Sequence, residues 1–107
     1  MMLEIKTEIV NEVATLHFDG FLDISTVDSI EISVSKLIDI HEVNLDFDKI
    51  TFVDSTGIGT ISKILRKLNS EGVTAKIRNI PAGVFEVFDI LGLPEIFGEE
   101  IFEMKKY

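Results

Sequence analysis

The 107-residue chain contains no cysteine, which excludes disulfide bonds, zinc fingers, iron–sulfur clusters and thiol catalysis. It also lacks any apolar run near the roughly 18 residues that a membrane span needs. Residues 1–6 do not pair a basic segment with an apolar one, as a signal peptide would. We therefore expect a cytoplasmic protein that does not insert directly into a membrane.

Basic residues are few, because 10 Lys and Arg stand against 19 Asp and Glu and the formal net charge is −9. Phosphate backbones are bound by basic surfaces, so we expect no nucleic acid partner. The charge is unevenly distributed: residues 1–54 hold 12 acids and 3 bases, whereas residues 55–78 hold one acid and five bases. Those bases are Lys63, Arg66, Lys67, Lys76 and Arg78.

Alternating apolar and polar residues predict strands over residues 3–9, 13–18, 43–47 and 73–78. The first two should form a β-hairpin, with Gly20 breaking the second strand. Apolar residues at helical spacing predict helices over residues 27–38, 58–68 and 81–91, and residues 48–54 are expected to form a loop. Residues 96–97 and 101–102 are compatible with one more short strand or helix, followed by a frayed tail.

This order of elements predicts parallel strands joined by right-handed crossovers, with antiparallel pairing added by the opening hairpin. We therefore expect one small α/β domain over residues 1–107. Its mixed sheet should have four or five strands, with the helices packed on one face.

The chain offers little catalytic chemistry. His17 and His41 have no evident partners for a metal site or a Ser–His–Asp triad. Neither the GxxxxGK[ST] nor the GxGxxG phosphate-binding motif is present. Asp46 and Asp48 are a possible magnesium pair, but they fit a solvated strand face and turn better. We therefore expect no enzymatic activity, no cofactor and no metal.

The most informative stretch is Phe52-Val53-Asp54-Ser55-Thr56-Gly57-Ile58-Gly59, where an apolar run meets polar residues before a helix. Asp54, Ser55 or Thr56 can cap that helix, which stabilises it by about 1 kcal/mol. Gly57 and Gly59 each cost the helix roughly 0.5–1 kcal/mol, so they indicate close approach of a core element or of a partner's backbone. A phosphate on the serine would add about −1.5 to −2 charge at the helix N-terminus.

Four segments of the chain resemble the STAS domain family, and within it the bacterial anti-sigma-factor antagonists. They are residues 18–23, 44–47, 52–59 and 88–93. Residues 52–59 match the family signature h-h-D-S-[ST]-G-[LI]-G closely, and the other three segments support it. The resemblance spans nearly the whole chain and implies a single STAS domain over residues 1–107.

The resemblance implies a protein-interaction switch. In this family, the unphosphorylated domain binds an anti-sigma factor that is also a serine kinase, and a sigma factor is thereby released for transcription. The kinase then phosphorylates the serine that follows the signature aspartate, here Ser55, and a separate serine phosphatase restores the free form. The partner-binding residues implied for this chain are Asp23, Asp54, Thr56, Gly57, Ile58 and Gly59.

Two other functions stay open at this point. A STAS domain can act as a scaffold or accessory subunit of a stressosome-like or transporter complex. The serine at position 55 argues mildly against that role, and the short chain argues against the STAS portion of an anion transporter. A nucleotide-binding module would use the backbone of Gly57 and Gly59 with Asp54, but it would lack Walker features and a histidine base.

Overall fold

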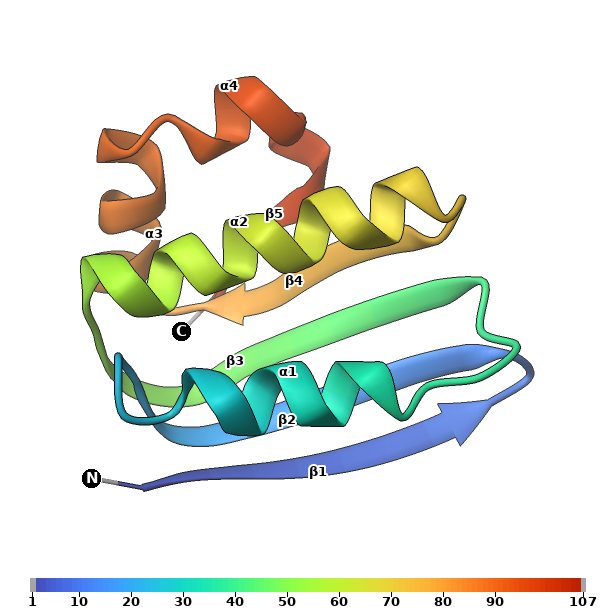
Figure 1. The fold of residues 1–107 in the computed structure, drawn as a ribbon. Coiled ribbons are helices and arrows are strands. Elements are labelled where there is room, and N and C mark those ends of the chain that lie inside the picture. Colours follow the sequence, from blue (N-terminus) through green and yellow to red (C-terminus); the bar gives the residue numbers. More distant parts are fainter. Residues whose placement is uncertain (1, 107) are drawn as a thin grey trace.

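The computed structural model describes residues 2–106. The elements in chain order are β1 (Leu3–Val10), β2 (Val13–Leu22), α1 (Val27–Ser35), β3 (Glu42–Val53), α2 (Ser55–Ser70), β4 (Thr74–Ile80), α3 (Ala82–Ile90), α4 (Leu93–Phe97), the 3-10 helix η1 (Glu99–Ile101) and β5 (Phe102–Met104) (Figure 1). The five strands form one sheet in the order β1-β2-β3-β4-β5. Only β1 and β2 are antiparallel, so the predicted mixed α/β sheet is confirmed.

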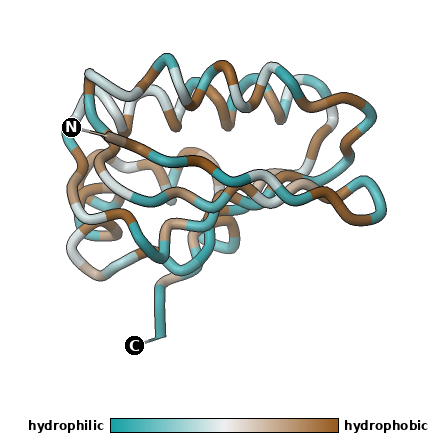
Figure 2. The backbone as a smooth tube through the Cα atoms, turned by 90° about the horizontal axis from the view of Figure 1, so that it is seen from below, coloured by the Kyte–Doolittle hydropathy of each residue, from teal (hydrophilic) through white to brown (hydrophobic). Residues whose placement is uncertain are grey.

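The helices cover one face of this sheet, as predicted. From β2 to β5 each strand is added on the same side of the one before it, so right-handed crossovers place the connecting helices on a common face. Figure 2 shows the long helices as a layer on one side of the strands. Leu16, Leu45 and Ile77 lie side by side on β2, β3 and β4 and have no exposed surface, because they face this layer.

A chain of aromatic rings extends this core from β2 to the far edge of the sheet. The ring centroids of Phe18 and Phe47 are 5.4 Å apart, and those of Phe47 and Phe88 are 5.9 Å apart. Phe88 lies 5.3 Å from Phe102 of β5. Tilted rings at these distances are favourable contacts, so the last strand is held by the same core as the central strands.

Two strands run well past their predicted ends. β2 continues past Gly20 to Leu22, and β3 runs through the expected loop to Val53. The two ends pair in parallel, but shifts of register between His17 and Asp19 and between Gly20 and Phe21 disrupt the alternation. Gly20 is a close-approach position within the strand, because its φ is +127° and a Cβ there would lie 2.2 Å from the carbonyl oxygen of Met2.

The elements also end at positions that the pattern did not predict. Helix α1 ends at Ser35, three residues before its predicted end, and α2 begins at Ser55, three residues before its predicted start. The expectation of a frayed tail is wrong for residues 103–104, which belong to β5, and the Lys105 N–H donates to the Ile80 carbonyl at 2.8 Å. No helix within residues 2–106 is long and apolar enough to cross a membrane.

Candidate functional site

The signature segment lies where two neighbouring parallel strands end. Leu22, the last residue of β2, is paired with Val53, the last residue of β3. The Asp54 N–H donates to the Leu22 carbonyl at 3.1 Å, which holds the two chain segments together just beyond the strands. Asp23 and Ser55, which are distant in sequence, therefore follow these strands at the same end of the sheet, the end where β2 and β3 terminate.

Asp54 is the capping residue of α2, among the three candidates that the sequence offers. Its backbone is extended, and its Oδ1 accepts the Gly57 N–H at 2.8 Å. Its Oδ2 accepts the Ile24 N–H at 3.4 Å, in the loop that follows β2. One carboxylate thus joins the start of α2 to that loop.

The loop between β2 and α1 is held by its own hydrogen bonds. Asp23 Oδ1 accepts the hydroxyl of Ser25 at 2.6 Å and the Ser25 N–H at 2.9 Å. These bonds, the hydroxyl first, lower the pKa of Asp23 below its ordinary value of 3.8, so this carboxylate is negative at neutral pH. Thr26 is buried and donates to the Phe21 carbonyl at 2.8 Å, which anchors the loop to β2.

Ser55 and Thr56 are exposed on the first turn of α2, whereas Gly57 and Ile58 are buried. A Cβ on Gly57 would lie 2.2 Å from the Leu22 carbonyl oxygen, so the close approach predicted for this glycine is made by the core. Ile58 has no exposed surface. Direct contact with a partner, implied for both residues by the resemblance, therefore does not fit their burial.

Gly59 differs from Gly57, because it is exposed and a Cβ there would meet no atom of residues 2–106 within 4 Å, apart from the neighbouring turns of its own helix. Its cost to helix stability is not offset by packing against any part of the chain that the structure describes. A glycine at this position leaves the helix backbone open to a partner.

Two exposed apolar side chains lie at this end of the sheet, and they were not predicted from the sequence as part of the site. Ile24 is 69% exposed and Phe52 is 48% exposed. The Phe52 ring lies 5.4 Å from that of Phe21, its pairing partner across β2 and β3. The apolar run before Asp54 was the signal for an exposed Phe52. Because residues 48–54 were predicted to form a loop, there was no strand face on which to place this side chain.

The segment of five bases after Ser55 does not form one surface. On α2, Lys63 forms an ion pair with Glu31 at 3.0 Å, and the Arg66 guanidinium lies over the Phe97 ring at 5.5 Å. Arg78 is on β4, where it donates to Asn44 at 2.9 Å. A continuous stretch of positive charge in the sequence is therefore divided between a helix and the sheet.

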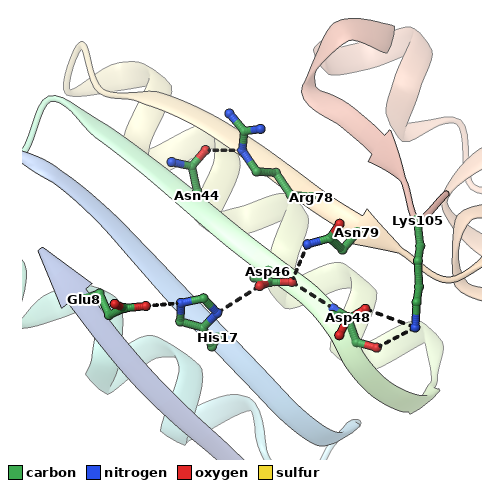
Figure 3. A network of polar contacts seen from close by, with 8 residues as sticks. All are labelled: Glu8, His17, Asn44, Asp46, Asp48, Arg78, Asn79 and Lys105. Atoms are coloured by element: carbon green, nitrogen blue, oxygen red, sulfur yellow. Dashed lines mark hydrogen bonds and ion pairs between the residues drawn. The ribbon is translucent and has the colours of Figure 1, made fainter. Parts of the chain in front are cut away.

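A second polar cluster lies on the helix-free face of the sheet (Figure 3). His17 Nδ1 is 2.8 Å from Asp46 Oδ2, and its Nε2 contacts the Glu8 carboxylate. Asp46 Oδ1 also accepts the side-chain amide of Asn79 and the Asp48 N–H, both at 3.0 Å. The cluster links β1, β2, β3 and β4. Within residues 2–106 no group of His, Asp and Glu side chains is arranged to hold a metal ion.

The stability of the protein should depend on the charge of Asp46. Burial alone would raise its pKa, but hydrogen bonds from Asn79, the Asp48 N–H and His17 outweigh that effect and lower the pKa below 3.8. The resulting stabilisation is complete above the unfolded-state pKa and is lost as pH falls through the lower folded-state pKa.

We expect Asp46→Asn to lower the free energy of unfolding by about 1–2 kcal/mol at pH 7 and to flatten its decline below about pH 4. Urea titrations between pH 2 and pH 7 measure both effects. Asp89→Asn is the matched control, because Asp89 is exposed on α3. Equal slopes for the wild type and Asp46→Asn would contradict the assignment.

Comparison with known proteins assigns the chain to a family. The family model described as "STAS domain" matches residues 4–106. The chain is 26% identical over 98 residues to the anti-sigma-B factor antagonist of Staphylococcus epidermidis. The aligned residues make up 90% of this chain and 91% of that protein.

Solved structures share the fold. The anti-sigma factor antagonist SpoIIAA in its unphosphorylated form aligns with a TM-score of 0.77 at 22% identity, over 96% of this chain and 90% of that one. Its phosphorylated Bacillus form aligns at 0.72, again at 22% identity, over 96% and 93% of the two chains. A sulfate transporter family protein from Wolinella succinogenes aligns with a TM-score of 0.80 at 13% identity, over 90% of this chain and 80% of that one.

Proposed function

This chain belongs to the STAS domain family, and we propose that it is an anti-sigma-factor antagonist switched by phosphorylation of Ser55. In the unphosphorylated state it binds an anti-sigma factor that is also a serine kinase, and a sigma factor is released in the cytoplasm. Phosphorylation ends the binding, and a serine phosphatase restores it. The likeness to the Staphylococcus epidermidis antagonist supports the general role.

The observation that carries the proposal is the position of Ser55. It is the exposed first residue of α2, directly after the capping carboxylate of Asp54 and beside the Asp23 loop. A phosphate there adds about −1.5 to −2 charge next to groups that are already negative. Gly57 and Ile58 remain in the core beneath, so the charge changes the surface without requiring a change of fold.

We propose that the docking surface combines polar and apolar groups around Ser55. Ile24 and Phe52 supply exposed apolar area, which is typical of the anchors of protein interfaces. Gly59 lets the partner approach the backbone of α2. The exposed or half-buried polar members of this surface are Asp23, Asp54, Ser55 and Thr56.

The test is phosphorylation by the anti-sigma factor kinase of the same organism with Mg-ATP, followed by mass spectrometry of the peptides. We expect one phosphate, on Ser55, and none on Ser55→Ala, while Thr56→Ala should still carry its phosphate on Ser55. A kinase that is active on a second substrate but leaves Ser55 unmodified would refute the proposal.

A scaffold or accessory role in a stressosome-like or transporter complex is the second candidate, favoured by the fold shared with the sulfate transporter family protein. Affinity capture discriminates the two: recovery of a transporter subunit or a large homo-assembly, with no sigma regulator, supports the scaffold. Nucleotide binding has less support, because the Gly57 N–H already donates to Asp54 at 2.8 Å. Calorimetric titration with ATP and GTP tests it.

A further inference from the structure

The sheet has one long unpaired edge. Within the described residues 2–106, β1 (Leu3–Val10) pairs only with β2, and Figure 1 shows no helix or strand beyond it. The opposite edge, β5, has three residues. Ile9 and Val10, near the end of β1, are 55% and 65% exposed. A long edge strand with exposed apolar residues is a template for pairing with another strand.

The backbone groups that face outward along β1 can be identified from its pairing with β2. Residues of an antiparallel pair alternate between hydrogen-bonded and non-bonded positions. The Phe21 N–H donates to the Met2 carbonyl at 3.2 Å, so even-numbered residues of this strand direct their backbone groups toward β2. The backbone N–H and C=O groups of Leu3, Ile5, Thr7 and Ile9 therefore point to the open edge.

The side chains of β1 make one self-pairing favourable. In an antiparallel pairing that places Thr7 opposite Thr7, Lys6 of each chain faces Glu8 of the other, and Ile5 faces Ile9. Opposite charges and β-branched pairs across strands are both stabilising. Shifting the centre to Lys6 would set Lys6 against Lys6 and Glu4 against Glu8, so like charges would oppose each other.

A centre at Ile5 also matches charges, because Lys6 would then face Glu4. That pairing leaves Ile9 and Val10 in water, whereas the centre at Thr7 covers both. Apolar burial therefore selects Thr7 as the centre.

We propose that a second copy of this chain pairs antiparallel with β1, centred on Thr7, to form a continuous ten-stranded sheet. In each chain Ser55 lies near the carboxyl end of β2. The two β2 strands run in opposite directions in this dimer, so the two Ser55 sites lie at opposite ends of it and stay accessible. A single pair of strands buries little area and each chain has a net charge of −9, so the dimer is weak and concentration-dependent. The proposal does not depend on the role of Ser55.

Sedimentation velocity over a concentration series tests this pairing. We expect a shift from monomer to dimer for the wild type and for the control Thr7→Val, which keeps the backbone N–H. Thr7→Pro removes the outward N–H but no bond to β2, so association should weaken at least about tenfold. Far-ultraviolet circular dichroism checks the fold of each variant. A wild type that stays monomeric up to near-millimolar concentration would overturn the proposal.

Cross-linking reports the register even if Thr7→Pro fails to fold. The chain has no native cysteine, so a single introduced thiol gives an unambiguous product. With a short bifunctional thiol reagent, Thr7→Cys should form covalent dimers, because the two positions face each other across the symmetry axis. Ile5→Cys should not, since its counterpart lies four residues along the strand. Cross-linking through position 5 in place of position 7 would refute the proposed register.

Discussion

Ser55→Glu is expected to weaken binding to the anti-sigma factor by about 100-fold, which corresponds to about 3 kcal/mol. The new carboxylate would sit beside the capping carboxylate of Asp54 and near the negative Asp23 loop. Docking a partner over three negative groups requires their desolvation while they repel one another. Ser55→Ala adds no charge and should bind within a few-fold of the wild type. Isothermal titration calorimetry measures all three affinities.

A matched control separates local charge from total charge. Ser70→Glu adds the same charge at the exposed last residue of α2, the far end from Ser55, and should leave the affinity nearly unchanged. Ser55→Glu should melt at the same or a slightly higher temperature, because a negative side chain in the first turn of a helix is favourable. Equal losses of affinity for both variants, or a large fall in the melting temperature of Ser55→Glu, would contradict the proposed switch.

Gly57→Ala is expected to be the most destabilising single-methyl change in the signature, with a loss of about 3 kcal/mol and roughly 10–20 °C in melting temperature. The added Cβ would lie 2.2 Å from the carbonyl oxygen of Leu22 and 2.6 Å from its carbonyl carbon. That backbone cannot move easily, because Leu22 is paired with Val53 and its carbonyl accepts the Asp54 N–H. Helix α2 must therefore shift away from β2.

Gly59→Ala is the matched control two residues further along the same helix. Beyond the neighbouring turns of its own helix, nothing in the described chain lies within 4 Å of the added Cβ, so the free energy of unfolding should rise by roughly 0.5–1 kcal/mol. If a partner approaches this backbone as proposed, the more stable variant should bind it less tightly. Thermal unfolding and calorimetry together give the test, and similar destabilisation by both substitutions would refute the distinction between the two glycines.

The local order of elements could be read from the sequence. Apolar residues such as Ile58, Ile61 and Leu65 repeat at helical spacing, and the alternation around Leu45 marks a strand, because burial on one face imposes a period on neighbouring residues. The same short-range logic offered Asp54, Ser55 and Thr56 as caps of the second helix, without choosing among them. It also predicted the hairpin, the crossovers and helices on one face.

The tertiary structure decided what depends on residues far apart in sequence. The parallel register of β2 and β3 brings Leu22 against Gly57 and Ile24 against Asp54, so it determines which glycine is buried and which residue caps α2. It also places the half-exposed Phe52 beside Phe21 at the ends of these strands. The one-dimensional pattern carries the periods of single elements, whereas register and contact between elements arise only when their faces pack together.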